Sequence, residues 1–386
     1  MDFDFDTPVE RRRTRSYKWD DTRRAFGKPD LLPFWVADMD FATPAPILDA
    51  IQRRCRHPSL GYEQRNDEYR ETVQAWLRDR HQWNVPLEWL MFCPPTSILG
   101  IYGLVTTLTE PGSSIVTQSP TYGPLQNLVV DNGRRLIRTL FREVDNKFVF
   151  DIGDLADKIE ADTGLFLLCS PHNPTGRVFS DAELRSIANL ADARDLVVIS
   201  DEVHADLVMP GHRHRPYGSI GGERSVTVIS PNKTFNTAGI PQATLVIPDP
   251  AIREKFQGFL DIAQINHDST FGAVGMIAAY RDCSAWLDAL LRYIAANHER
   301  VAEFLSRNVA GVRCSPAEAT YLAWLDCRAT GLPEDELMQR FVEKGGIALY
   351  GGSEFGPDGA GFFRMNVACP RSTLERGLRG IKEALA

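Results

Sequence analysis

The sequence lacks any long apolar run. No stretch of its 386 residues reaches the roughly 18 consecutive apolar residues that a membrane-spanning helix needs. The first residues, Met1–Asp6, alternate acidic with apolar side chains and contain no apolar core of the kind a signal peptide carries. We therefore expect no membrane segment and no secretory signal, and we expect a cytoplasmic protein.

Cysteine is scarce and follows no pattern. The seven cysteines include no Cys-x-x-Cys pair, and an odd number without a framework indicates reduced thiols in a cytosolic protein. His172, His212 and His214 have no carboxylate or second histidine at helical ligand spacing. We expect no disulfide framework and no metal site.

An excess of positive charge is also missing. The 43 lysines and arginines are outnumbered by 51 aspartates and glutamates, and the formal net charge of −8 argues against a nucleic-acid-binding surface. Neither a Gly-x-Gly-x-x-Gly stretch nor a P-loop is present, so these two nucleotide-binding motifs are excluded. The basic run Arg11–Arg15 has acidic neighbours on both sides, which is typical of a solvated or subunit-embracing arm.

Three polar clusters are present, each directly after an apolar, strand-like run. They are Ser170–Gly176, Ser200–His204 and Ser230–Asn236. The functional site of an open α/β sheet forms outside the carboxyl ends of its strands, so these clusters are expected to meet in one site. Lys233 lies in the third cluster, after the β-branched run Ser225–Ile229.

Alternating strand-like and helix-like segments predict the fold class. They favour an α/β protein with a doubly wound, mostly parallel sheet and helices on both faces, plus a smaller α+β domain. Ser180 and Glu183 stand at capping-box spacing and mark the start of a helix over Asp181–Arg194. A long helical pattern, Ala273–Asn308, is expected to contain the helix that crosses between the domains. We predict a large domain at 46–270 and a second unit formed by 1–45 plus 271–386.

The three clusters, in this order, resemble a known family. The pattern Asn-Pro-x-Gly, then Asp-Glu-x-His, then Ser-x-x-Lys-Thr-Phe is similar to the fold type I pyridoxal-phosphate (PLP) enzymes, and above all to their cystathionine β-lyase and cysteine C–S lyase branch. The resemblance runs from about Leu32 to the C-terminus. It implies PLP as cofactor, an amino acid as substrate and a homodimer.

The resemblance assigns roles to the residues around the cofactor ring. It implies that Lys233 binds the cofactor covalently and, once released, acts as the base at the substrate Cα, with a lowered pKa. Asp201 is the expected partner of the ring nitrogen, while Asn173 and His204 match the positions that contact the phenolic oxygen. Tyr122 matches the residue that covers one face of the ring. A core position in the following helix is its alternative. A further match, Val203, is expected beneath the other face.

Three residues are expected to hold the cofactor phosphate, and a fourth to reach it from a neighbouring subunit. The helix start at Pro94–Ser97 offers the N–H groups of Thr96 and Ser97 at a positive helix end, with plain N-capping by Thr96 as the alternative. The resemblance adds Ser230. It also implies that Tyr62 contacts the phosphate bound to the partner subunit, although an isolated loop tyrosine is normally a surface or core residue.

The substrate residues follow from the resemblance as well. It implies that Arg364 clamps the substrate α-carboxylate, while an internal salt bridge is the alternative for an arginine in an apolar strand. Val36 and Ala37 are expected to line the substrate pocket together with Asn173. Their segment also suits an apolar anchor for the N-terminal arm.

The predicted activity is a PLP-dependent α,β-elimination. The substrate class is an S-substituted L-cysteine, cleaved to a thiol, pyruvate and ammonia. An aminotransferase, or another PLP reaction of an oxidative or cyclising kind in specialised metabolism, is the alternative, because the first steps are the same. A third hypothesis is a regulator that acts by binding another protein.

Overall fold

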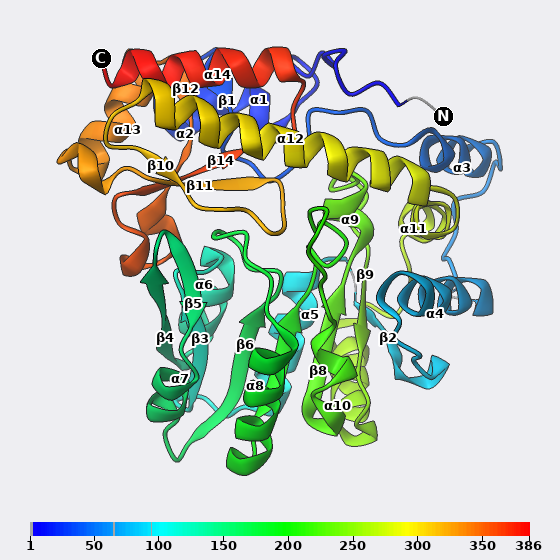
Figure 1. Cartoon of the computed structure of the whole chain (residues 1–386). Helices are drawn as coiled ribbons and strands as arrows, with labels where there is room; N and C mark the ends of the chain where they lie inside the picture. The colour runs from blue at the N-terminus through cyan, green and yellow to red at the C-terminus, as the bar shows by residue number, and fades with distance from the viewer. Residues whose placement is uncertain (1–2, 65, 94) are drawn as a thin grey trace.

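The computed structural model describes residues 3–64, 66–93 and 95–386, so Arg65 and Pro94 lie outside the described residues. Within them, the largest element is a mixed sheet of eight strands (Figure 1). In spatial order these are β2 (Leu90–Cys93), β9 (Ala243–Val246), β8 (Ser225–Ile229), β7 (Val197–Asp201), β6 (Thr163–Cys169), β3 (Ser114–Ser119), β4 (Arg135–Val144) and β5 (Lys147–Phe150). The strands β8, β7, β6, β3 and β4 are parallel, β9 and β5 run antiparallel to them, and β2 pairs antiparallel with β9 and so runs in the direction of the central strands. The predicted fold class is confirmed.

Helices cover both faces of the sheet. Alternate residues of the central strands point to opposite faces, and both sets are apolar, so both faces must be covered. In β6, Leu165 and Leu167 join one apolar core, whereas Phe166 and Leu168 join another. The first core is closed by α5 (Ser97–Leu108), α6 (Gly123–Asp131) and α10 (Pro250–Ala263). The second is closed by α7 (Ile152–Lys158) and α8 (Asp181–Arg194). This continuous burial explains why β6 is apolar from Leu165 to Cys169.

Two helix predictions have different outcomes. The predicted bounds of α8 are confirmed, and its capping box is present: Ser180 accepts from the Glu183 backbone N–H and the Glu183 side chain accepts from the Ser180 backbone N–H. The helical pattern noted over Ala273–Asn308 contains the end of α11 (Thr270–Asp282) and all of α12 (Ser284–Asn308), which meet at Cys283, and the crossing between domains stays a prediction. Neither glycine nor proline marks this break in the sequence.

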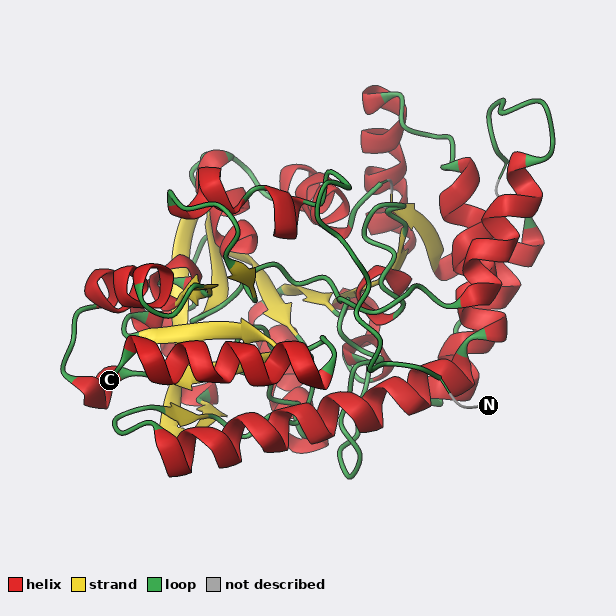
Figure 2. Cartoon of the chain, turned by 90° about the horizontal axis from the view of Figure 1, so that it is seen from above, coloured by secondary structure: helices red, strands yellow, loops and turns green. Residues whose placement is uncertain are grey.

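A second, antiparallel sheet lies toward the C-terminus. Its order is β10 (Arg313–Cys314), β11 (Leu322–Asp326), β14 (Phe362–Asn366) and β13 (Tyr350–Gly351). Around it stand α12, α13 (Glu334–Glu343) and α14 (Arg371–Ala384), and a short pair of strands joins β1 (Leu32–Pro33) to β12 (Ile347–Ala348). Seen from above, α12 and α14 lie side by side along one edge of the molecule (Figure 2). The domain limits at residues 45/46 and 270/271 stay a prediction.

The remaining helices lie near the chain start and beside the large sheet. They are α1 (Tyr17–Asp20), α2 (Thr22–Phe26), α3 (Ala45–Cys55), α4 (Asp67–His81) and the single turn α9 (Pro231–Thr234). Helix α11 packs against α3 and α4, to the right in Figure 1. No helix among the described residues is long and apolar enough to cross a membrane.

Candidate active site

A cavity of about 500 Å³ lies at the carboxyl ends of the central strands and collects the predicted site. All of the predicted site residues except Tyr62 line it, namely Val36, Ala37, Thr96, Ser97, Tyr122, Asn173, Asp201, Val203, His204, Ser230, Lys233 and Arg364. They come from the ends of β2, β3, β6, β7 and β8, from the segment after β1 and from β14. Residues more than 300 positions apart in the chain thus share one cavity.

Lys233 lies in α9, the single turn that follows β8, and Ser230 is its N-cap. The Nζ atom donates a hydrogen bond of 2.8 Å to the backbone oxygen of Ala37. Burial, together with the positive charge of Arg364, lowers the pKa of Lys233 to about 8 in spite of the opposing charges of Asp38 and Asp201. A substantial share of this amine is therefore neutral near physiological pH, as a base or a nucleophile requires.

Asp201 and His204 place two unsatisfied polar atoms in the cavity. The Oδ1 atom of Asp201 and the Nδ1 atom of His204 are buried and have no hydrogen-bond partner among the described residues. Burial raises the pKa of Asp201 to about 6, against the attraction of Lys233, and burial lowers the pKa of His204 well below its ordinary value. Buried polar atoms are normally paired, so these two are suited to a ligand. The PLP ring would fit these two atoms, because its protonated nitrogen could lie beside Asp201 and its phenolic oxygen near His204.

Arg364 is buried, and no carboxylate pairs with it among the described residues. Its Nη1 atom donates to Asn173 Oδ1 at 3.1 Å and its Nη2 atom to the Trp35 backbone oxygen at 2.8 Å, while Nε has no partner. The alternative of an internal salt bridge is therefore wrong. Burial lowers the pKa of Arg364 to about 10, and a substrate carboxylate would supply the missing negative charge.

The turn that was expected to bind the cofactor phosphate also forms the N-cap of a helix, which was its predicted alternative. Thr96 is the N-cap of α5, and its hydroxyl accepts from the Leu99 N–H. Capping uses only one of the first N–H groups, so those of Ser97 and Ile98 still point out of the helix start, at its positive end. The Ser230 hydroxyl lies 2.7 Å from the Gln242 backbone oxygen, so its proton already has an acceptor.

Two tyrosines were assigned to the cofactor, and the structure places them differently. Tyr122 lines the cavity with Val203, and burial raises its pKa. Tyr62 is 88% exposed and lies outside its own subunit's cavity, with its ring centroid 4.5 Å from that of His267.

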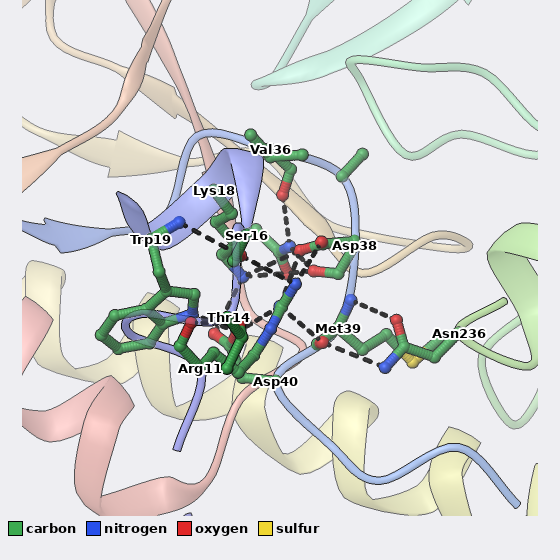
Figure 3. Close-up of polar contacts among 12 residues, drawn as sticks. Arg11, Thr14, Ser16, Lys18, Trp19, Val36, Asp38, Met39, Asp40 and Asn236 are labelled. Atoms are coloured by element: carbon green, nitrogen blue, oxygen red, sulfur yellow. Dashed lines mark hydrogen bonds and ion pairs between the residues drawn. The ribbon is translucent and has the colours of Figure 1, made fainter. Parts of the chain in front are cut away.

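The N-terminal arm is held by a buried ion network (Figure 3). Lys18, with 1% of its side chain exposed, donates to Asp40 Oδ2 at 2.8 Å, and Trp19 donates to Asp40 Oδ1 at the same distance. Arg11 binds both carboxylates, Asp38 at 2.6 Å and Asp40 at 2.8 Å. Burial works to raise the pKa of Asp38, but the hydrogen bond from Arg11 and the charge of Lys18 hold it below its ordinary value. The view of this run as a solvated arm is therefore wrong for Arg11.

The segment after β1 is also held by hydrogen bonds from Asn236 and Asn366. Asn236, three residues after Lys233, accepts from the Met39 N–H at 3.0 Å and donates to the Met39 backbone oxygen (Figure 3). It also donates to the Phe41 backbone oxygen. Asn366 of β14 donates to the backbone oxygens of Val36 and Asp38. These contacts fix the Ala37 carbonyl that faces Lys233. These contacts hold the segment by polar groups, whereas the sequence suggested an apolar anchor.

Several lining residues were not expected from the sequence. They are Tyr17, Trp35, Ile98, Gly123, Pro124, Asn127, Cys169, Asn232, Ala238, Pro241, Tyr350, Glu354 and Phe355. Trp35 and Cys169 belong to segments that the sequence did single out, and Asn232 lies next to Lys233. Tyr17, Tyr350, Glu354 and Phe355 carry no local signal, because they reach the cavity only through the folding of the arm and the C-terminal sheet.

Two of the three histidines considered for metal binding, His172 and His214, have other neighbours. His172 Nδ1 lies 2.8 Å from Thr175 Oγ1, and burial lowers the pKa of His172 to about 3. His214 Nε2 lies 2.7 Å from a buried carboxylate oxygen of Glu202. Over the described part of the chain, no group of three histidine, cysteine or acidic side chains is arranged to hold a metal ion.

Comparison with known proteins assigns the family. The pattern of the aminotransferase class I and II family matches residues 30–381, and the chain belongs to this family. The chain is 39% identical over 386 residues to cystathionine beta-lyase PatB of Bacillus subtilis (strain 168), which covers 99% of this chain and 100% of that protein. The resemblance stated from the motifs is confirmed.

Two solved structures are similar over the whole chain. A PLP-bound putative aminotransferase from Clostridium difficile 630 superposes with a TM-score of 0.98 at 35% identity, covering 100% of both chains. Cystalysin from Treponema denticola, whose structure contains a pyridoxal 5'-phosphate cofactor, gives a TM-score of 0.96 at 31% identity and covers 100% of this chain and 99% of that chain.

Proposed function

We propose that this protein is a PLP-dependent C–S lyase that cleaves an S-substituted L-cysteine. The observation that carries the proposal is the geometry of one cavity. The Lys233 amine, an unpartnered oxygen of Asp201 and the guanidinium of Arg364, whose Nε is free among the described residues, all line it. The similarity to a cystathionine β-lyase over the full chain supports the choice of reaction.

The cofactor fits the groups that the cavity offers. Bound PLP supplies an electron-withdrawing ring that stabilises negative charge at the substrate Cα. Asp201 would keep the ring nitrogen protonated, and His204 and Asn173 would contact the ring oxygen. Tyr122 and Val203 would cover the two faces. The N–H groups at the start of α5 and the Ser230 hydroxyl would hold the phosphate, for which Ser230 must turn its proton away from Gln242.

The chain's own residues then have separate tasks in the reaction. Arg364 binds the α-carboxylate and, with Asn173, sets the orientation of the amino acid. Lys233 in its neutral form removes the Cα proton, and the Ala37 carbonyl holds the amine in place. Asp201 and Arg364 are buried, so water screens their charges less than it would at the surface.

The reaction balances without an external oxidant. The Cα–H and Cβ–S bonds break, the electron pair of the first forms the Cα=Cβ bond, and the sulfur leaves with its own pair and takes up a proton. The resulting aminoacrylate is hydrolysed by one water to pyruvate and ammonia. The products are therefore a thiol, pyruvate and ammonia in equal amounts.

A homodimer completes this proposal. Tyr62 is exposed on its own subunit, and its loop also exposes Leu60, which is 58% accessible. A partner that covers this loop would place Tyr62 at the phosphate of the other subunit. Dimerisation would thereby supply a group that a single chain lacks.

An aminotransferase is the second candidate. It is favoured by the family to which the chain belongs and by the similarity to a putative aminotransferase structure. Both activities need the same Lys233, Asp201 and Arg364, so these residues do not discriminate between them. The two activities differ in whether the C–S bond of the substrate is broken.

The decisive experiment follows both outcomes in one vessel. The purified protein is incubated with PLP and L-cystathionine or an S-alkyl-L-cysteine, with and without a 2-oxo acid as amino acceptor. We expect thiol and pyruvate in a 1:1 ratio, formed without the acceptor. Amino transfer to the acceptor with the C–S bond intact would establish the second candidate instead. Absence of both reactions, with no PLP absorbance on the protein, would favour a purely protein-binding role.

A further inference from the structure

A row of aromatic rings leads away from the guanidinium that would bind the substrate carboxylate. The Cζ atom of Arg364 lies 4.9 Å from the ring centroid of Phe355 and 5.1 Å from that of Tyr350. Tyr350 continues to Trp35, whose ring is nearly parallel to it at 6.3 Å and 13°. The ring of Tyr17 follows, 4.9 Å from that of Trp35. All four aromatic residues line the cavity.

The outer end of this aromatic row is held in place. Tyr17 is 57% exposed, but it begins α1, whose next residue is the buried Lys18 of the ion network (Figure 3). Trp35 is 4% exposed, and its indole N–H donates to the Lys18 backbone oxygen at 3.0 Å. The Lys18–Asp40 pair therefore fixes the backbone that carries the Tyr17 ring to the mouth of the cavity.

The charges along the cavity are distributed unevenly. Among the described lining residues, Lys233 and Arg364 are the only lysine and arginine, and both have tasks in the reaction proposed above. Glu354 lines the same cavity on an exposed turn and adds a negative charge beside Tyr350 and Phe355. Arg24, near the outer side of Tyr17, is already paired with Asp21. An anionic substituent on the substrate sulfur would therefore find no spare cation here.

We propose that the row Phe355–Tyr350–Trp35–Tyr17 is the binding site for the sulfur substituent, and that it selects L-cysteine conjugates with an aromatic substituent that carries no negative charge. This inference rests on the proposed function, because it places the cysteine part of the substrate between Arg364 and Lys233. Ring stacking against a fixed aromatic surface supplies the preference. Tyr17 is the specificity-determining residue at the outer end.

The test compares substrates that differ only in the substituent. The kcat/KM of the PLP-loaded enzyme is measured with S-benzyl-L-cysteine and with S-methyl-L-cysteine, which is too short to reach Tyr17. We expect the benzyl-to-methyl ratio to fall about 3- to 10-fold in Tyr17→Ala, which is the range that a ring contact of this kind supplies. Tyr17→Phe keeps the ring and should keep the ratio. Val144→Ala, at an exposed apolar residue outside the cavity, is the matched control.

Each result has a separate meaning. An unchanged benzyl-to-methyl ratio in Tyr17→Ala overturns the aromatic site. An equal loss with both substrates also overturns it, since that pattern shows a general effect of the arm. If neither conjugate releases pyruvate and thiol from the wild-type enzyme, the proposed function fails before the substituent site is tested.

The charge preference is tested with a third conjugate. S-(4-carboxybenzyl)-L-cysteine keeps the ring and adds a carboxylate. We expect its kcat/KM to be about 5-fold or more below that of the benzyl conjugate, and we expect Glu354→Gln to make this difference smaller. Glu223→Gln, at an exposed carboxylate outside the cavity, should leave the gap as it is. Equal rates with both aromatic conjugates in the wild-type enzyme overturn the charge selectivity.

Discussion

The Lys233 amine donates its hydrogen bond to a backbone oxygen, that of Ala37, and to no side chain among the described residues. Tyr321 donates to the same oxygen at 3.0 Å. A backbone acceptor carries no net charge, so it can orient the amine without holding it protonated as a carboxylate in that position would. The position of this carbonyl depends on residues far from it in the sequence, and a variant of Asn236 tests that dependence.

Removal of Lys233 should abolish the reaction. A base of this kind contributes about 10²- to 10⁴-fold to the rate, and Lys233→Ala also removes the covalent attachment of the cofactor. The measurements are kcat with an S-alkyl-L-cysteine and the site of labelling after borohydride reduction of the PLP-loaded protein. Lys382→Met, at an exposed residue of α14, should change neither. A label on another lysine in the wild-type protein contradicts the assignment.

The lowered pKa of Lys233 predicts a pH dependence of cofactor uptake by the cofactor-free protein. Only the neutral amine attacks the aldehyde, so the rate should rise with pH up to about 8 and level off above it. An ordinary lysine would continue to gain reactivity toward pH 10. The rate is followed by the change in PLP absorbance after mixing. Arg364→Gln removes a positive charge that lowers this pKa, so the midpoint should move upward.

Asn236 should matter more for turnover than for folding. Its φ of 55° is readily adopted by glycine, so Asn236→Gly removes the three hydrogen bonds to Met39 and Phe41 without straining the backbone. We expect kcat to fall about 10-fold or more, because small misplacements of a catalytic group are costly. Faster amide hydrogen exchange at Met39 should accompany the loss. A normal kcat with fast exchange at Met39 would show that the position of the Ala37 carbonyl does not depend on the hydrogen bonds of Asn236.

The Lys18–Asp40 pair should be important for stability. Asp40→Asn leaves the buried Lys18 ammonium with only the more distant carboxylate of Asp38, 3.6 Å away, and breaking a buried ion pair in this way costs about 3 kcal/mol or more of the free energy of unfolding. The midpoint of urea unfolding is the readout. Asp30, whose side chain is 84% exposed, also pairs with an arginine, and Asp30→Asn should cost about 1 kcal/mol or less. Equal losses in the two variants would rule out a special role for burial.

The shared site can be tested by mixing two inactive proteins. Lys233→Ala lacks the base, and Tyr62→Ala lacks the group proposed to cross the interface. If subunits exchange at random in a 1:1 mixture, half of the dimers are mixed, and each has one intact site, so about a quarter of the wild-type activity should return. Sedimentation analysis supplies the oligomeric state. A mixture that stays inactive although the subunits exchange would place Tyr62 outside the active site.

Much of the fold could be predicted because its signals are local. The apolar run of β6 and the capping box of α8 depend on neighbours within a few positions, and both elements form as expected. The break between α11 and α12 at Cys283 could not be predicted, because no glycine or proline marks it. There the packing of the two helices against different neighbours decides the course of the chain. The cytoplasmic location and the domain limits stay predictions.

The chemical groups of the cavity could be predicted from local sequence: one lysine, one aspartate and one asparagine, each placed at the end of a strand. Parallel strands must bring such residues to one edge, whatever the details of packing. Their surroundings depend on contacts between distant segments. Met39 and Asn236 are 197 positions apart, and Tyr17 meets Trp35 through the folded arm. Periodicity in a sequence predicts which face of an element is buried. The element that packs against that face depends on contacts between distant segments in the folded chain.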